Sequence, residues 1–255
     1  MIYVSINSKG GVGKSTLANQ ILPAYLYLKN GSKTRLIEID DENEDSKDLA
    51  ASEILDIKAI HTSQIKTIDE VFIDDDIDTI IDVGGNKTAT IFLSEMRKIG
   101  EVENIVWLIP IGQGRQDAAN ALDTGNAIKE IDTDAKIIYV LSNSKSDDLQ
   151  WEYLHFFGND YLDTPFAIQT DSYIVIPHSD IVNNAKTFGK TVYDISQNDK
   201  DFRALAKEAK QEGDDDLKRE YLFLNRVKNE AINYIDDLQS DVFPKLDELI
   251  AATAQ

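Results

Sequence analysis

The chain has 255 residues, contains no cysteine and carries a formal net charge of −20. Its length suits one α/β domain with or without an appended segment, and its 42% of hydrophobic residues can fill a large core. The lack of cysteine excludes disulfides and thiolate metal sites. No apolar run is long enough for a membrane span and no secretory signal pattern opens the chain, so we expect a cytoplasmic protein.

Charge is distributed unevenly along the chain. Residues 186–228 hold ten Lys and Arg against nine Asp and Glu, whereas residues 1–185 hold 15 against 31. The last segment, residues 229–255, holds one against six. Because proteins that bind nucleic acid usually present a basic surface, the overall acidity argues against general DNA binding. Any surface that faces DNA is therefore expected within residues 186–228.

The first pattern along the chain combines a strand, a glycine-rich loop and a helix. Residues 2–6 are apolar and rich in β-branched side chains, residues 9–16 read KGGVGKST, and the apolar residues after them have helical spacing. Glycines let successive backbone N–H groups face an anion, and the N-terminus of the next helix adds positive potential. The pattern therefore predicts a phosphate-binding loop in which Lys14 contacts the β- and γ-phosphates and Ser15 ligates Mg²⁺. The other loop residues expected at the nucleotide are Gly10, Gly11, Val12, Gly13 and Thr16. The alternative is a glycine-rich turn with two surface lysines.

The spacing of this loop departs from the usual phosphate loop, because Ser8 rather than glycine stands five residues before Gly13. With Lys9 at its start, the segment resembles the deviant Walker A loop of the ParA/MinD family of ATPases, which also includes the nitrogenase iron protein. The resemblance implies a doubly wound, mostly parallel α/β sheet of the P-loop type and a homodimer that holds ATP and Mg²⁺ between its subunits. It also implies that Lys9 reaches the nucleotide of the other subunit and takes part in catalysis with Lys14. The lack of cysteine excludes the iron–sulfur cluster of the nitrogenase iron protein.

The helix after the loop is expected over residues 14–28, either with a bend near Pro23 or as two short pieces, and Asn30 and Gly31 end it. Residues 35–40 form the next predicted strand, which ends in carboxylates. Sites in parallel α/β sheets lie at the carboxyl ends of strands. The resemblance assigns Asp40 the catalytic position, where it orients the attacking water or a metal-bound water. Glu38 replaces the aspartate that the family usually has two residues earlier, and residues 41–45 are expected to be a solvated acidic loop.

Residues 79–85, with the sequence TIIDVGG, form the third motif. An apolar strand that ends in aspartate is the Walker B arrangement, so Asp82 is expected to bind Mg²⁺-bound water near the Ser15 hydroxyl. Gly85 is expected to donate its N–H to the γ-phosphate. Taken without the upstream loop, the same segment is equally well explained as a buried strand that ends in a turn.

Three further strands are predicted, over residues 105–111, 136–145 and 174–178, with a helix over residues 118–131 between the first two. The resemblance places adenine recognition at the end of the second of these strands, where we assign it to Asn143; the alternative is that this asparagine only begins a turn. Pro177, near the end of the last strand, is also expected at the nucleotide. The aromatic-rich residues 151–161 are expected to form a helix that is either core or a surface for a partner.

The C-terminal region contains a candidate DNA-binding face. Lys200, Arg203, Lys207 and Lys210 are spaced to lie on one face of a helix over residues 199–212, where they can contact DNA phosphates. The alternative is an ordinary solvated face. Residues 213–216 separate this helix from the next one and cap the next helix at its start. The apolar spacing of that next helix runs from Leu217 to Leu238. A shorter helix is expected after Pro244.

The motifs and the resemblance indicate two alternative functions. The first is a ParA-type ATPase that acts in plasmid or chromosome partition, with an ATPase domain over residues 1–212, a helical extension over residues 213–255 and, as the family implies, a centromere-binding partner protein. The second is an ATP switch of the same type that positions or recruits a protein cargo, for example in conjugation, without general DNA binding. The acidic extension lacks a basic amphipathic face, which argues against a membrane anchor.

Overall fold

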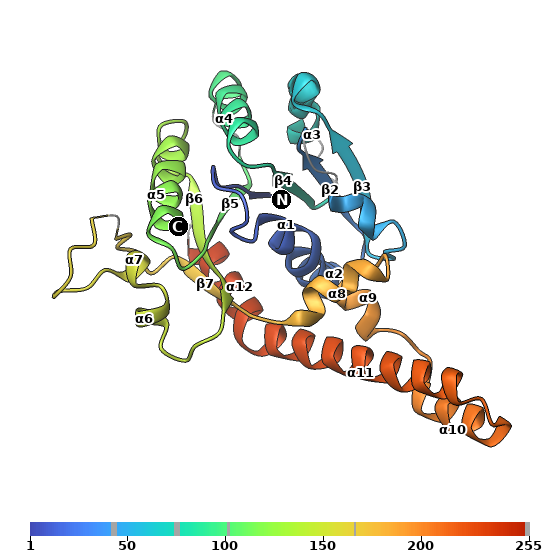
Figure 1. Ribbon diagram of the computed structural model, residues 1–255. Helices are drawn as coiled ribbons and strands as arrows, with labels where there is room; N and C mark the ends of the chain where they lie inside the picture. Colours follow the sequence, from blue (N-terminus) through green and yellow to red (C-terminus); the bar gives the residue numbers. More distant parts are fainter. Residues whose placement is uncertain (42–44, 74–76, 101–102, 166, 253–255) are drawn as a thin grey trace.

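The computed structural model describes residues 1–41, 45–73, 77–100, 103–165 and 167–252. Its centre is a seven-stranded sheet in the order β3-β2-β4-β1-β5-β6-β7, and every neighbouring pair is parallel (Figure 1). The strands are β1 (Ile2–Ser5), β2 (Thr34–Ile39), β3 (Leu55–Ile60), β4 (Thr79–Val83), β5 (Ile105–Ile111), β6 (Lys136–Ser144) and β7 (Tyr173–Pro177). The doubly wound parallel sheet expected from the sequence is thus confirmed.

The central strands are apolar on both faces because helices cover both sides of the sheet. Every residue of β1, β4 and β5 is buried, whereas β3, at the edge, exposes alternate polar residues. Successive residues of a strand point to opposite faces, so Tyr3 packs in one core cluster and Val4 in the other.

Helices form the two outer layers. They are α1 (Lys14–Thr16), α2 (Leu22–Asn30), α3 (Asp69–Ile73), α4 (Lys87–Ile99), α5 (Arg115–Lys129), α6 (Leu149–Glu152), α7 (Leu154–Phe157), α8 (Asp180–Thr187), α9 (Val192–Ser196), α10 (Phe202–Glu212), α11 (Asp215–Asp237) and α12 (Phe243–Ala252). The π-helical turns η1 (Leu17–Ile21) and η4 (Leu238–Val242) and the 3₁₀ turns η2 (Asp45–Leu49) and η3 (Thr62–Ile68) complete the described elements. Helices α4 and α5 cover one face of the sheet, and α2, α8, α11 and α12 cover the other (Figure 1). Within the described ranges, no helix is both long and apolar enough to cross a bilayer.

The helix after the glycine loop is continuous through Pro23, with a widened turn where a bend was expected. Segments α1, η1 and α2 follow one another without a break, and Pro23 is the second residue of α2. Proline has no N–H to donate, and a π-helical turn immediately before it alters the hydrogen-bond pattern at that point. Gly31 adopts a φ of 66° and its N–H donates to the Tyr27 carbonyl oxygen (2.8 Å), so the predicted end of the helix is confirmed.

The C-terminal helices repeat this arrangement. Helix α11, the π-helical turn η4 and α12 form one run from Asp215 to Ala252, and Pro244 is the second residue of α12. The shorter helix expected after Pro244 is present as α12, which begins one residue before the proline and is continuous with α11 through the widened turn. Asp214 caps the start of the run, as predicted, by accepting a hydrogen bond from the Leu217 N–H (2.9 Å).

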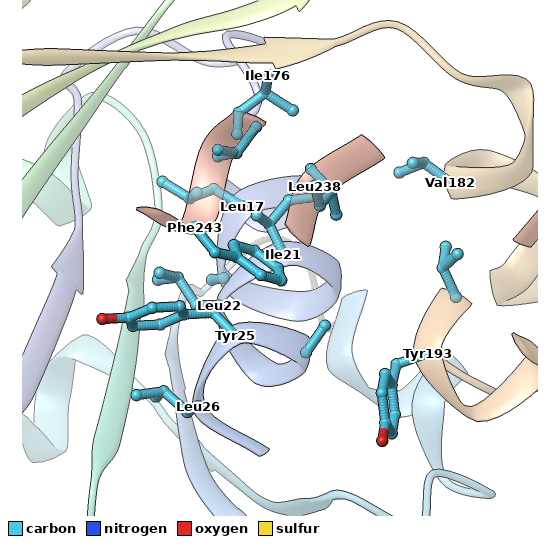
Figure 2. Close-up of a cluster of buried hydrophobic side chains, with 14 of the residues drawn as sticks. Leu17, Ile21, Leu22, Tyr25, Leu26, Ile176, Val182, Tyr193, Leu238 and Phe243 are labelled. Carbon is cyan, nitrogen blue, oxygen red and sulfur yellow. The ribbon is translucent and has the colours of Figure 1, made fainter. Parts of the chain in front are cut away.

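The end of this run packs against the helix that follows the glycine loop. Figure 2 shows Leu238 and Phe243 beside Leu17, Ile21 and Tyr25 in one buried cluster. The rings of Tyr25 and Phe243 lie 5.4 Å apart between centroids. Residues from the C-terminal segment and from the strand–loop–helix unit thus share one hydrophobic core.

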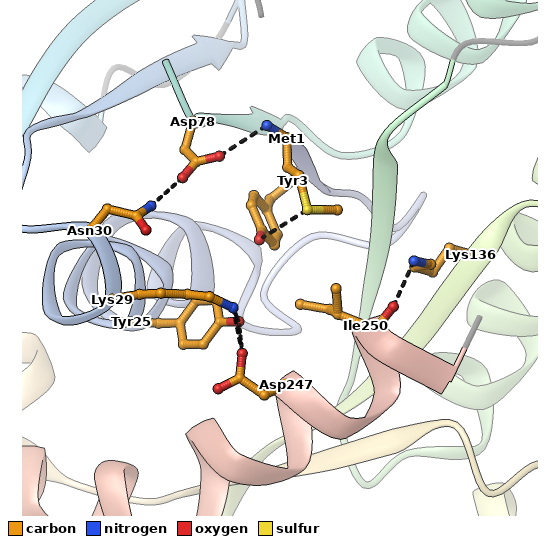
Figure 3. A network of polar contacts seen from close by, with 9 residues as sticks. All are labelled: Met1, Tyr3, Tyr25, Lys29, Asn30, Asp78, Lys136, Asp247 and Ile250. Carbon is orange, nitrogen blue, oxygen red and sulfur yellow. Dashed lines mark hydrogen bonds and ion pairs between the residues drawn. The ribbon is translucent and has the colours of Figure 1, made fainter. Parts of the chain in front are cut away.

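Polar contacts nearer the surface also hold the C-terminal run against the helix that follows the glycine loop (Figure 3). Tyr25 Oη donates a hydrogen bond to Asp247 Oδ1 (2.6 Å), and Lys29 Nζ lies 2.5 Å from the same oxygen. Burial and the Asp247 carboxylate raise the pKa of Tyr25, so this hydroxyl remains a donor. Lys136 Nζ donates to the Ile250 carbonyl oxygen (2.7 Å) in the last turn of α12.

Two segments near the surface differ from their predicted form. The aromatic stretch forms two single-turn helices, α6 and α7, instead of one helix, and Gly158 ends the second with a φ of 79°. Tyr153 and Phe156 are buried, whereas Trp151 is 70% exposed, so part of the stretch is core and part is surface. Helix α10 begins at Phe202, after the N-cap Asp201, which leaves Lys200 outside the helix.

Candidate functional site

The glycine loop between β1 and α1 has the backbone that its sequence predicted. Gly11 and Gly13 have φ values of 77° and 99°, which side chains with a Cβ rarely adopt. A Cβ on Gly13 would also lie 3.0 Å from the Ser142 side chain. Buried Asn7 anchors the loop, because its Nδ2 donates to the Pro110 carbonyl oxygen (2.8 Å) and its Oδ1 accepts from the Lys9 N–H (2.9 Å).

Lys14 is buried at the base of this loop. Its Nζ donates to the Lys9 carbonyl oxygen (2.8 Å). Burial lowers the pKa of Lys14, and the charges of Asp82 and Asp40 act in the opposite direction. Lys14, to which the sequence assigned phosphate contact, is therefore within electrostatic reach of Asp82 and Asp40, the residues predicted to bind metal and to act in catalysis.

Two consecutive glycines after β4 allow this close approach. A Cβ on Gly84 would lie 2.8 Å from Asp40 Cγ, and a Cβ on Gly85 would lie 3.2 Å from the Gly10 backbone nitrogen and 3.6 Å from Lys14 Nζ. Any side chain on Gly84 would therefore collide with the Asp40 carboxylate. The sequence pointed to Gly85 but gave no reason to select Gly84, because a glycine's steric role depends on a neighbour from another strand.

Glu38, which replaces the usual aspartate, holds the segment after β2. It is buried, and its Oε2 accepts hydrogen bonds from the Ser46 hydroxyl (2.5 Å) and the Ser46 N–H (3.2 Å). The longer glutamate side chain thus ties η2 to the carboxyl end of β2. Of the acidic loop predicted over residues 41–45, residues 42–44 lie outside the described ranges.

Lys9 lies beside a carboxylate of its own chain. Its Nζ is 3.2 Å from Asp117 Oδ1, and its side chain remains 38% exposed. Asp117 Oδ2 also accepts from the Gly114 N–H (3.2 Å) at the start of α5. Asp117 was not found from the sequence, because more than 100 residues separate it from the loop and no motif surrounds it.

A cavity of about 360 Å³ adjoins the glycine loop. The predicted nucleotide residues that line it are Gly11, Val12, Gly13, Thr16, Asn143 and Pro177. Gln113, Asn183 and Tyr234 also line it and were missed. Tyr234 belongs to α11, and its Oη donates to the Pro177 carbonyl oxygen (3.3 Å), so the C-terminal run forms part of the cavity wall. The backbone of the glycine loop and the amide side chains of Gln113, Asn143 and Asn183 give this cavity the donors and acceptors that suit a nucleoside triphosphate.

The donor set beside Lys14 suits Mg²⁺. This ion prefers oxygen ligands and is usually held by one or two carboxylates together with substrate phosphates. The Ser15 hydroxyl and the carboxylates of Asp82 and Asp40 are oxygen donors of this kind. The described residues contain no group of three or more His, Cys, Asp or Glu side chains that could hold a metal ion.

The four candidate DNA-binding cations lie away from the cavity. Arg203, Lys207 and Lys210 are exposed on α10, which packs against α11 to form an arm that projects from the body (Figure 1). Lys200 is also exposed but precedes the helix. The structure therefore brings three of the four onto one helix.

Comparison with known proteins identifies the fold. The cell division protein MinD of Aquifex aeolicus matches with a TM-score of 0.54 over 94% of this chain and 97% of MinD, at 15% sequence identity. The MinC:MinD complex of the same organism matches with a TM-score of 0.52, also at 15% identity, over 94% of this chain and 96% of that one. A putative plasmid partition protein of Borrelia burgdorferi bound to AMPPNP matches less well, with a TM-score of 0.48 at 14% identity over 89% of this chain and 97% of that one. No family model and no curated protein sequence matches the chain. The chain therefore has the P-loop fold of MinD, as the resemblance at residues 9–16 implied.

Proposed function

We propose that the chain is an ATP hydrolase that works as a nucleotide switch. The observation that carries this proposal is the placement of Lys14, whose buried ammonium lies near Asp82 and Asp40 beside a cavity lined by the glycine loop. A buried cation with carboxylates at the carboxyl ends of β2 and β4 is the arrangement required to hold a triphosphate and to act on its γ-phosphate. The MinD-like fold supports the same proposal.

Each residue has a role in this proposal. The backbone N–H groups of the loop and the Lys14 ammonium neutralise charge that develops on the transferred phosphoryl group. Asp40 orients the attacking water, and Ser15 and Asp82 hold Mg²⁺, which supplies further positive charge when bound with ATP. Gly85 donates its N–H to the γ-phosphate, while Asn143 and Pro177 contact the adenine.

The proposed dimer places Lys9 at the nucleotide of the second subunit. In the single chain Lys9 pairs with Asp117 at the mouth of the site, and its partial exposure leaves it accessible to a second molecule. When Lys9 leaves Asp117 for the triphosphate of the second subunit, its anionic partner is replaced by a more highly charged one. ATP thereby favours the two-subunit state, and hydrolysis removes the γ-phosphate that attracts the lysine.

The proposed dimer is tested by sizing. We expect the protein to be monomeric with ADP and dimeric with a non-hydrolysable ATP analogue and Mg²⁺. Lys9→Ala removes the cation that crosses the interface but leaves Lys14 in place, so it should bind the analogue within about threefold of the wild-type affinity and remain monomeric. Light scattering behind a sizing column measures the mass, and a wild-type mass that does not depend on the nucleotide contradicts the proposal.

Two cellular roles suit a nucleotide switch of this kind. The first is plasmid or chromosome partition, in which the arm cations bind non-specific DNA and a centromere-binding protein is the partner. The second is recruitment or positioning of a protein cargo. The net charge of −20 favours the second, and one similar structure is a MinD in complex with another protein, MinC.

DNA binding separates the two tasks. If the arm contacts phosphates through Lys200, Arg203, Lys207 and Lys210, an ATP-dependent shift of non-specific DNA should weaken with salt with a log–log slope of about −4 for each subunit whose arm is bound. Changing Arg203 and Lys207 to glutamate should abolish the shift without changing ATP hydrolysis. The absence of a shift at low salt, with normal hydrolysis, would instead assign the chain to protein recruitment.

A further inference from the structure

The end of β6 contains an irregularity at the residue assigned to adenine. Ser142 pairs with Ile176 of β7 and Ser144 pairs with Pro177, so Asn143 is an extra residue between two consecutive partners. Its φ of 67° is in the left-handed region. A bulge of this kind re-aims a side chain and is frequent beside functional sites. Here it brings Asn143 to the wall of the cavity.

A single carboxylate holds the chain that leaves this bulge. Glu152, at the end of α6, accepts hydrogen bonds through Oε2 from the Ser144 hydroxyl (2.6 Å) and the Ser146 N–H (3.3 Å). Its Oε1 accepts from the Lys145 N–H (2.8 Å). Three consecutive residues after Asn143 are therefore bound to one side chain.

The same carboxylate also positions a residue of the cavity wall. Gln113 Nε2 donates to Glu152 Oε1 (2.8 Å) and lies 3.4 Å from the Asn143 carbonyl oxygen. Gln113 follows β5 and Asn143 lies in the last residues of β6, so Glu152 joins the carboxyl ends of two neighbouring strands. The next residue, Tyr153, is buried and donates its Oη to the Ser142 carbonyl oxygen (2.8 Å), which fixes the other side of the bulge.

Both carboxylate oxygens of Glu152 act as hydrogen-bond acceptors in these contacts. Every partner named above is a donor, so a neutral amide at this position would direct its own N–H groups at other donors. Although burial alone would raise the pKa of Glu152, the hydrogen bonds from residues 144–146 and Gln113 lower it. The side chain is thus ionised at neutral pH and acts as an acceptor throughout.

We infer that Glu152 is a positioning residue for the nucleoside: it sets the geometry of Asn143 and Gln113 at the base end of the cavity, while the glycine loop holds the phosphates independently. The inference rests on the proposed ATP-binding function. Because the two ends of the ligand are held by different parts of the chain, loss of Glu152 should affect recognition of the base and leave binding of the phosphate chain unchanged.

Glu152→Gln tests this inference by calorimetric titration with two ligands, a non-hydrolysable ATP analogue and inorganic tripolyphosphate, each with Mg²⁺. We expect the affinity for the ATP analogue to fall about 10- to 100-fold, since a charged acceptor with several donors is lost, and that for tripolyphosphate to stay within about twofold. The preference for ATP over GTP should also decrease. The matched control is Asp148→Asn, the same change on the residue that caps α6 through the Trp151 N–H, and it should leave both affinities unchanged.

The other outcomes overturn the inference in distinguishable ways. Unchanged binding of the ATP analogue by Glu152→Gln shows that the side chain does not position the nucleoside. An equal loss for both ligands shows that it supports the fold as a whole. A wild-type protein that binds neither ligand refutes the proposed function itself, and the inference with it.

Discussion

Replacing Lys14 with methionine is expected to lower the rate of ATP hydrolysis about 10³-fold, as removal of a buried charge-stabilising group does in other enzymes. Lys14 is 7% exposed, and its ammonium is held by the Lys9 carbonyl oxygen and by the charges of Asp82 and Asp40. Methionine keeps much of the length of the side chain but removes the charge. In the proposed site the γ-phosphate would then face two carboxylates without the cation that offsets them, so the loss should appear in kcat as well as in nucleotide affinity.

The measurement is phosphate release at saturating ATP and Mg²⁺, with Lys98→Met as the matched control. Lys98 pairs with Glu95 on the exposed side of α4 and is 62% exposed, so the control should hydrolyse ATP at the wild-type rate. Thermal unfolding of both variants checks that each is folded. Hydrolysis by Lys14→Met within tenfold of the wild type would show that this lysine does not act on the phosphate.

The parts of the site that lie in sequence motifs were predictable. Strand β5 is a continuous apolar run and β4 is apolar apart from Thr79 and Asp82, so their positions followed from the sequence with little error. Parallel strands bring their carboxyl ends to one edge of the sheet, which is why Asp40 and Asp82, 42 positions apart along the chain, were expected near Lys14. Once the strands are placed in a parallel sheet, the fold itself brings these three residues close together.

The parts that depend on contacts between distant segments were not predictable. Asp117, Glu152 and Tyr234 are single polar or aromatic residues in helices with no motif around them, and each acquires its role only when another segment is placed beside it. Apolar spacing indicated that α11 has a buried face, but periodicity does not say what covers that face. The sequence therefore left open whether the C-terminal segment packs on the body, and the structure places it against the helix that follows the glycine loop.

This packing makes Leu238 a test of how the C-terminal run contributes to stability. Leu238 has no exposed surface and lies with Leu17 and Ile21 in the buried cluster of Figure 2, and those two residues also line the cavity beside the glycine loop. Leu222, on the same helical run, is 48% exposed on the arm. The two leucines allow one substitution to be compared inside and outside the shared core.

Leu238→Ala is expected to lower the free energy of unfolding by about 3 kcal/mol, the usual cost of a buried cavity of this size. For a chain of this length that corresponds to a fall in Tm of about 6–12 °C by scanning calorimetry. Leu222→Ala removes the same atoms from a half-exposed position and should change the stability by less than about 0.5 kcal/mol. Equal shifts in the two variants would show that the C-terminal run is not part of the core that supports the glycine loop. If the ATP analogue raises the Tm of Leu238→Ala as well as that of the wild type, the ligand and the C-terminal helices stabilise the same unit.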